Sequence, residues 1–143
     1  MKVEQSILIA AKRDRVWQGW VEEISAWWSK PYYIDPEHVT GLTLEPRIGG
    51  RFIEEWGKDA GYLIGQVIEW LPPQRLSYTW SERSWAGIIT VVRLEFTAVK
   101  DQTQINLTHD GFERLPDGKE QRKSYDHGSA DLLGRLKAYV EKR

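Results

Sequence analysis

Residues 51–110 alternate repeatedly between apolar and polar side chains, in short runs that turn-forming residues separate. In a β-strand, such alternation places successive side chains on opposite faces, so that Leu76, Tyr78 and Trp80 share one face. Consecutive strands joined by short turns favour an antiparallel meander with one buried and one solvated face. The predicted strands are residues 51–56, 61–71, 74–81, 88–99 and 102–110.

The N-terminal part adds further elements. Val16, Trp17 and Trp20 form the apolar stripe of a short helix, and Gly49-Gly50 predicts a tight turn with positive φ. The predicted elements are a strand at 3–10, a helix at 13–21, a helical turn at 22–28, a loop at 29–41 and a short strand at 43–46. Loops of this length inside a domain are often lids or binding segments. We therefore predict that Trp28 and the loop after it cover a site.

A long amphipathic helix is predicted at residues 119–142. Tyr125, Leu132, Leu136 and Val140 recur at helical spacing, and Asp117 with Glu120 resembles a capping box. Such a helix needs a large apolar surface, which the inner face of the sheet supplies. The predicted fold class is α+β: one domain over residues 1–143, with a curved antiparallel β-sheet wrapped around the C-terminal α-helix and two short helices after the first strand.

Small residues on the helix face large ones on the sheet. Gly128, Ser129 and Ala130 are consecutive near the start of the helical stripe, whereas the inner sheet face carries aromatic rings, and the chain has eight tryptophans. This combination favours an enclosed apolar pocket. The alternative is that the large rings fill the space and leave a solid core.

Composition limits the function classes. The net charge is −1, which argues against nucleic-acid binding. The chain has no cysteine, no signal-peptide pattern at its start and no apolar run long enough to span a membrane, so we expect a cytoplasmic protein. No phosphate-binding loop, serine-nucleophile motif or metal-ligand pattern is recognisable, and neither cofactor nor metal is expected.

Two inward-facing polar residues are candidates for chemistry. His109 falls on the face of Ile105 and Leu107, where an imidazole with a pKa near the working pH would donate to a ligand or act as a general base. The alternative is a core histidine bonded to a carbonyl or a tyrosine hydroxyl. Glu54 is either the polar anchor of the pocket or an acid with a raised pKa, unless it sits solvated at the rim or pairs with an arginine. His38, beside Asp35 and Glu37, is weak evidence for a metal site.

The chain resembles the helix-grip superfamily of birch-pollen-allergen, START and polyketide-cyclase proteins (SRPBCC), and within it the branch of activators of the 90-kDa heat-shock protein ATPase (AHSA-like). The matching residues run in order along the chain: Ile9-Ala10-Ala11, Val16-Trp17, Trp27-Trp28, Gly49-Gly50-Arg51-Phe52, 72–76, Tyr78-Thr79-Trp80, 103–112 and 133–140. In one departure, the Gly-Trp pair that often opens the last helix of the family is Gly128-Ser129 here, which is expected to enlarge or reshape the pocket. The resemblance implies the helix-grip fold, a pocket and a link to stress response.

Three functions are compatible with these observations. The first, which we prefer, is a non-enzymatic module that binds a small hydrophobic or amphipathic ligand. The second is an enzyme of polyketide-cyclase or hydrolase type that uses His109 or Glu54 for proton transfer. The third is a chaperone-binding domain. The chain is expected to be a monomer or a homodimer. The predicted ligand-binding residues are Trp28, Phe52, Glu54, Trp56, Tyr78, Trp80, Val92, Leu94, His109 and Leu132.

Overall fold

A seven-stranded antiparallel sheet forms the framework of the protein, and a computed structural model describes residues 1–142 of it. Along the sheet the strands follow the order β1-β7-β6-β5-β4-β3-β2, so every neighbouring pair except β1 and β7 is consecutive in sequence. Strands β2 to β7 form the predicted antiparallel meander, and β1 pairs with β7 at one edge of it. The strands are β1 (Lys2–Ile9), β2 (Gly41–Leu44), β3 (Arg51–Gly57), β4 (Ala60–Leu71), β5 (Arg75–Trp80), β6 (Thr90–Val99) and β7 (Gln102–Asp110).

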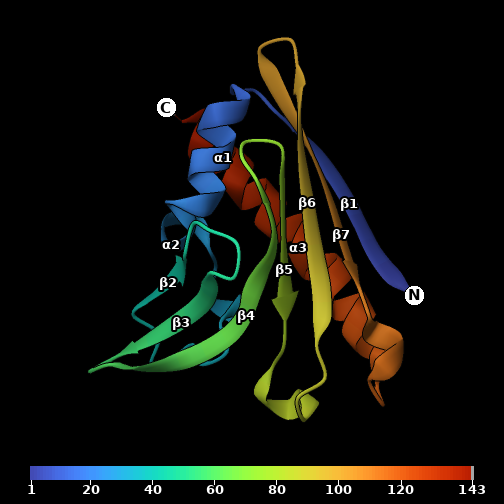
Figure 1. Cartoon of the computed structure of the whole chain (residues 1–143). Coiled ribbons are helices and arrows are strands. Elements are labelled where there is room, and N and C mark those ends of the chain that lie inside the picture. The colour runs from blue at the N-terminus through green and yellow to red at the C-terminus, as the bar shows by residue number, and fades with distance from the viewer. Residues whose placement is uncertain (143) are drawn as a thin grey trace.

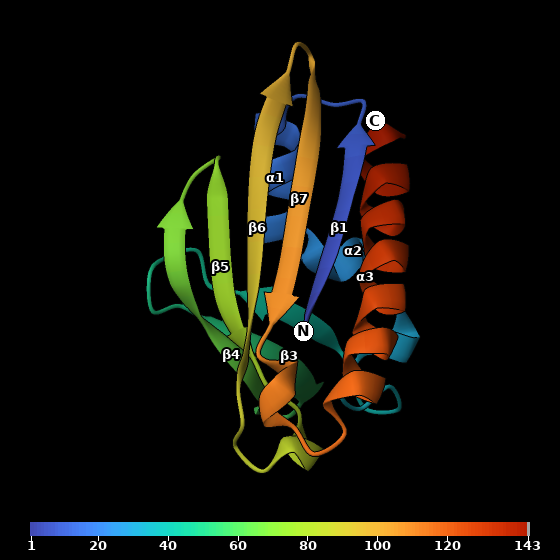
Figure 2. The same ribbon diagram turned by 90° about the vertical axis from the view of Figure 1, so that its right-hand side faces the viewer.

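The helices gather on one face of this sheet. In Figure 1 the long C-terminal helix runs diagonally behind β5, β6 and β7, and Figure 2 shows it alongside β1, on the same side as the two short helices. The helical elements are α1 (Arg13–Val21), α2 (Ile24–Trp27), α3 (Gly118–Glu141) and the 3₁₀ turns η1 (Lys30–Tyr32), η2 (Arg83–Trp85) and η3 (Phe112–Arg114). The predicted α+β class, with a curved sheet around a long C-terminal helix, is confirmed.

Helix α3 is fixed to the edge strand β1 rather than to the middle of the sheet. Gln5 Nε2 donates to Asp126 Oδ1 at 2.8 Å, and Lys137 Nζ donates to the Leu8 carbonyl at 2.9 Å. At the other end of α3, Gly19 of α1 lets the two helices approach, because a Cβ there would lie 2.9 Å from Val140 Cγ1. Because α3 lies along this edge, it leaves part of the concave face of the sheet uncovered. That part is covered in part by α1, α2 and the loop that follows them.

Alternation along β5, β6 and β7 buries the predicted faces. Leu76, Tyr78 and Trp80 are buried, as are Ile105 and Leu107, while Arg93 and Glu95 are exposed. The pattern holds because these strands pair without an irregularity, from Arg75 with Glu95 to Trp80 with Thr90 and along the whole of β7. The apolar faces then supply the inner surface against which α1 and α3 pack.

Two sequence interpretations need correction. Asp117 precedes α3 but its side chain makes no capping bond, and its carboxylate instead accepts from Gln121 Nε2 at 3.0 Å. The strand predicted at residues 88–99 begins at Thr90, because η2 and the left-handed residues Ala86 and Gly87 occupy the preceding segment.

The glycine turn is confirmed in part. Gly49 has a φ of 75°, as predicted. Gly50 is required for a different reason: a Cβ there would lie 2.3 Å from the Glu45 carbonyl oxygen. Within residues 1–142, no helix is both long and apolar enough to cross a membrane.

Candidate functional site

A cavity of about 290 Å³ lies between the sheet and the N-terminal half of α3. Tyr78, Val92 and His109 line it from the strands, and Ser129 and Leu132 line it from the helix. The small residues at 128 and 129 leave this space open, since a larger side chain on that helical face would fill it. Gly128 and Ser129 thus face Tyr78 and Trp80 across this space.

The segment from Trp28 to Ile34 roofs the cavity. Trp28, Pro31, Tyr32, Tyr33 and Ile34 all line it. The rings of Trp28 and Trp80 stack with their centroids 6.2 Å apart and 29° between their planes. The roof segment thus packs an aromatic side chain against the sheet, as expected of a loop that covers a site.

Hydrogen bonds hold this roof to α3 and to itself. Tyr32 Oη donates to Asp131 Oδ2 at 2.7 Å, and Trp28 Nε1 donates to the Tyr32 carbonyl at 3.3 Å. Burial first, and the bond to Asp131 second, raise the pKa of the Tyr32 hydroxyl, so it stays a donor at neutral pH. The first half of the roof is therefore tied to α3.

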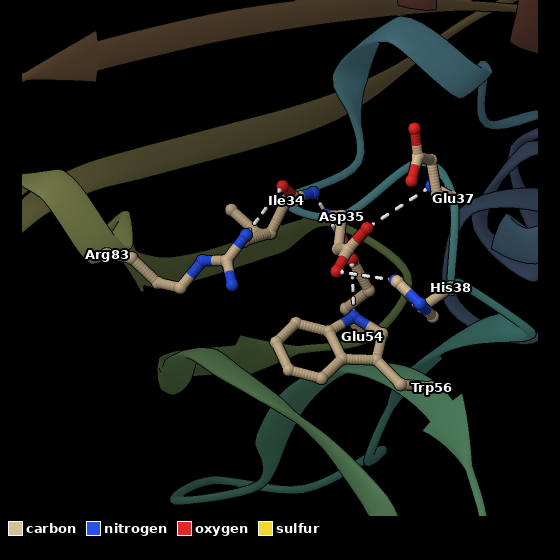
Figure 3. Close-up of polar contacts among 7 residues, drawn as sticks. All are labelled: Ile34, Asp35, Glu37, His38, Glu54, Trp56 and Arg83. Atoms are coloured by element: carbon tan, nitrogen blue, oxygen red, sulfur yellow. Dashed lines mark hydrogen bonds and ion pairs between the residues drawn. The ribbon is translucent and has the colours of Figure 1, made fainter.

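Glu54 holds the second half of the roof from β3 (Figure 3). This carboxylate is fully buried. Its oxygens accept from the backbone N–H groups of Ile34 at 2.5 Å and Asp35 at 2.8 Å, and from Trp56 Nε1 at 2.8 Å. Three donors compensate the cost of burying the carboxylate. Glu54 is therefore a structural clamp on the loop.

Arg83, from the β5–β6 connection, closes the same loop from the outside. Its guanidinium donates to the Ile34 carbonyl at 3.3 Å and lies over the Trp56 ring, 5.3 Å from the centroid. Figure 3 shows Arg83 and Glu54 reaching Ile34 and Asp35 from different elements. The roof therefore joins β3, α3 and the β5–β6 connection.

A chain of hydrogen bonds joins three polar side chains at the cavity. Trp80 Nε1 donates to Tyr125 Oη at 2.7 Å, and Tyr125 Oη donates to Glu82 Oε2. Burial, followed by the nearby charge of Glu82, raises the pKa of Tyr125 well above its usual value, so the phenol keeps its proton. All three side chains line the cavity.

His109 supplies a second polar group, deeper in the cavity. Thr90 Oγ1 donates to the Trp80 carbonyl at 3.2 Å and lies 2.6 Å from His109 Nε2. Because the threonine proton is used at Trp80, Nε2–H donates to Thr90, and Nδ1 keeps a free lone pair. Burial lowers the pKa of His109 to about 3, so the ring is neutral at physiological pH. The expectation that the pKa of His109 lies near the working pH is wrong. Burial removes water from around the imidazole and so disfavours its protonated form.

Six of the ten predicted ligand-binding residues line the cavity and four do not. Those at the cavity are Trp28, Tyr78, Trp80, Val92, His109 and Leu132. Phe52 lies behind them, edge-on to Tyr78 and Trp80 with centroids 5.0 and 5.7 Å apart. Leu94 is buried two residues further along β6, beyond the end of the cavity.

Trp56 and Glu54 share one face of β3, as predicted, because Trp56 Nε1 donates to the Glu54 carboxylate. Neither residue lines the cavity. Trp56 stacks on Tyr62, with centroids 6.4 Å apart, and Arg83 lies over its ring. Glu54 is inward, as predicted, but it faces the loop backbone instead of the cavity.

Several cavity-lining residues were not singled out from the sequence. Tyr32, Tyr33 and Ile34 lie in a loop without periodicity, and Glu82 follows the end of β5. Tyr125 was visible as part of the α3 stripe, but its hydroxyl contacts join residues 43 or more positions apart. Only the folded structure brings these groups together.

The acidic loop brings two of its three candidate side chains together. His38 Nδ1 lies 3.0 Å from Asp35 Oδ2 on the surface, and Asp35 Oδ1 accepts from the Glu37 backbone N–H. Within residues 1–142, no cluster of three or more histidine, aspartate or glutamate side chains has metal-binding geometry.

Comparisons with known proteins agree with this architecture. The family model described as Activator of Hsp90 ATPase homolog 1-like protein matches residues 10–141. Protein MLL2253 from Mesorhizobium loti is 18% identical, with a TM-score of 0.77, over 99% of this chain and 98% of that one. The Aha1 dimer from Colwellia psychrerythraea is 17% identical, with a TM-score of 0.70, over 99% and 96%.

A third solved structure is a biosynthetic enzyme by its description. The anthrahydroquino-gama-pyrone synthase Txn09, complexed with SUM, is 23% identical, with a TM-score of 0.66, over 96% of this chain and 95% of that one. At these identities the likenesses show a shared fold. A search of curated proteins gave no significant match.

Proposed function

The chain belongs to the family of Activator of Hsp90 ATPase homolog 1-like proteins, and from that premise we propose that it is a binding module for a small hydrophobic or amphipathic molecule. The observation that carries the proposal is the roofed cavity of about 290 Å³. Ligand sites are typically concave and mainly apolar, with a few placed polar groups. Aromatic walls, with His109 and Glu82 as polar groups, fit that description.

The size of the cavity limits the ligand. Cavities that bind small molecules usually measure roughly 300–1,000 Å³, so this one is at the lower end. It suits a compact ring system better than a long acyl chain. The proposed ligand contacts are the six predicted residues that line the cavity, together with Tyr125 and the roof.

Blocking the cavity tests the proposal. Ser129 is buried and faces the cavity, so Ser129→Trp places an indole in the space that a ligand would occupy. Ala130 is the next residue of α3 and is exposed, which makes Ala130→Trp the matched control. N-phenylnaphthylamine, a neutral dye that brightens in apolar surroundings, is the probe.

We expect saturable dye binding to the wild type and to Ala130→Trp, and at least a tenfold weaker affinity for Ser129→Trp. Equal binding by all three proteins would place the dye outside the cavity and contradict the proposal. Absence of binding to the wild type would contradict it as well.

Proton transfer by His109 is a second candidate function. Its support is the neutral imidazole that lines the cavity with an Nδ1 lone pair able to accept a proton, although a pKa of about 3 makes it a weaker base than one matched to neutral pH. The synthase description of Txn09 shows that this fold accommodates catalysis. Glu54 is no longer a candidate for proton transfer, because the loop N–H groups and Trp56 occupy its oxygens.

Native mass spectrometry separates binding from catalysis. If His109 acts on the ligand, the wild type co-purifies with product and His109→Gln with unconverted substrate of a different mass. If the protein only binds, both co-purify with the same compound. The exposed His127→Gln is the matched control and is expected to behave as the wild type does.

Chaperone binding is a third proposal, and it rests on the family description and on the Aha1 likeness. It uses an outer surface of the protein. Binding of a chaperone to Ser129→Trp with unchanged affinity is the expected result, and loss of that binding would assign the contact to the cavity instead.

A further inference from the structure

We propose that the cavity selects aromatic ligands that carry a cationic amino group and discriminates against carboxylates, with Glu82 as the selecting residue. The inference rests on the proposed binding function and deepens it by assigning the charge of the ligand. Glu82 lines the cavity and is partly exposed, whereas His109, which also lines it, is buried.

The first support is the charge inventory of the cavity. Among the described lining residues, Glu82 is the only one with a formally charged side chain at neutral pH, and neither lysine nor arginine lines the space. The His109 ring is neutral, because burial lowers its pKa to about 3. Among these lining residues, Glu82 is therefore the charged side chain that a bound ligand can contact directly.

The second support is the way in which this carboxylate is held. Tyr125 Oη donates to Oε2, and Trp80 Nε1 fixes Tyr125 in turn at 2.7 Å. Within residues 1–142, Oε1 of Glu82 has no hydrogen-bond partner. The carboxylate is thus oriented in advance and keeps one oxygen for a donor, which favours a charge-assisted bond at low entropic cost.

The basic residue next to Glu82 in the sequence points away from the cavity. Arg83, the neighbouring positive charge in sequence, does not neutralise this corner, because its guanidinium contacts the Ile34 carbonyl and the Trp56 ring outside the cavity.

A carboxylate ligand would meet the opposite situation. Its negative charge would approach Glu82 in a partly desolvated space, where repulsion between like charges exceeds that in water. A neutral hydroxyl loses the charge attraction but still donates to Oε1. The expected order of affinity is therefore ammonium, then hydroxyl, then carboxylate, on one common ring.

Three ligands with the same ring test this order by calorimetry at neutral pH: naphthylmethylamine, naphthylmethanol and naphthoate. Each is titrated into the wild type, Glu82→Gln and Glu113→Gln. Glu82→Gln keeps the shape and an acceptor for Tyr125 while removing the charge. Glu113 is exposed in η3 and does not line this cavity, so Glu113→Gln controls for the change in net charge alone.

We expect the wild type to bind the amine at least about tenfold more tightly than naphthoate. Glu82→Gln should remove most of that difference, and Glu113→Gln should keep it. If naphthylmethanol binds but Glu82→Gln leaves the difference unchanged, or if no difference exists, the inference is wrong and the binding function stands. If none of the three ligands binds the wild type, the inference and the proposed function fail together.

Discussion

His109, which lines the cavity, is expected to make the stability of the folded protein depend on pH. Burial lowers the pKa of this imidazole from an ordinary 6.5 to about 3 in the folded protein. The unfolded chain therefore binds the extra proton first, and stability that is present above pH 6.5 is lost as the pH falls toward 3. The loss attributable to His109 is about 2 to 3 kcal/mol between pH 6.5 and 4.5.

Denaturant unfolding of the wild type and His109→Phe across this range measures the effect. The phenylalanine ring keeps most of the packing against Phe112, whose centroid is 4.6 Å away, and Thr90 keeps its bond to Trp80. We expect a shallower pH dependence for His109→Phe and an unchanged one for the exposed His127→Gln. Parallel curves for His109→Phe and the wild type would mean that the imidazole titrates normally.

Glu54 is expected to be necessary for the order of the roof. In Glu54→Gln the amide NH₂ replaces one acceptor, so a donor faces the N–H group either of Ile34 or of Asp35, which bond to different oxygens of Glu54. A buried donor without a partner costs about 2 to 4 kcal/mol. Hydrogen exchange of these two amides should accelerate, and the free energy of unfolding should fall by that amount.

Glu55→Gln is the control for this substitution, because Glu55 is exposed on the other face of β3 and accepts from Thr43 Oγ1. It should change the free energy of unfolding by no more than about 0.5 kcal/mol. Slow exchange at Ile34 and Asp35 in Glu54→Gln would show that the clamp is dispensable.

At the scale of elements, two glycines differ in how much room a side chain would have at their positions. Gly65 lies at the point where β4 meets β5, and a Cβ there would be 1.7 Å from the Thr79 carbonyl oxygen. Gly65→Ala should therefore force the two strands apart and destabilise the protein by about 3 kcal/mol or more. Gly134 lies in α3, and a Cβ there meets no atom within 4 Å.

Gly134→Ala should stabilise the protein by about 0.5–1 kcal/mol, because alanine loses less backbone entropy in a helix. Thermal unfolding of both variants checks the pair. A destabilised Gly134→Ala would contradict the open surroundings of that residue, and a neutral Gly65→Ala would contradict the close approach of β4 and β5.

The elements themselves could be predicted from the sequence where periodicity is uninterrupted. Strands β5, β6 and β7 pair without a register shift over residues 75–80 and 91–99, so alternation alone identified Tyr78, Trp80, Val92 and His109 as inward. On β3 alternation correctly placed Glu54 and Trp56 on one face, but it gave no sign that the backbone of Ile34 and Asp35 binds there. Such a contact depends on a loop distant in sequence, which a single-strand pattern does not contain.

The site was less predictable than the fold for a related reason. Glu82, Tyr125 and Tyr32 acquire their positions from contacts such as Tyr125 to Trp80 and Tyr32 to Asp131, which span 45 and 99 residues. Local spacing carries no information on such pairs. The small residues Gly128 and Ser129 did reveal the hollow, because a missing side chain is a local feature of the helix.

At the scale of the whole molecule, the cavity is space that a better-packed core would fill. Interiors normally pack as densely as organic crystals, and empty volume forfeits contacts on every side. The seven-stranded sheet and α3 leave about 290 Å³ open between them, and the roof from Trp28 to Ile34 covers this space. Stability is therefore expected to rise when that space is occupied, whether by a ligand or by the protein itself.

Ser129→Trp tests this relation between packing and function. The indole would bury new apolar surface against Leu132 and Val92, and cavity-filling changes commonly add about 0.5–2 kcal/mol. Its melting temperature should rise above that of the wild type, whereas the exposed Ala130→Trp should leave it nearly unchanged. A ligand that fills the same space should stabilise the wild type but not Ser129→Trp. If Ser129→Trp melts lower and still gains stability from the ligand, then the open volume is not where the ligand binds.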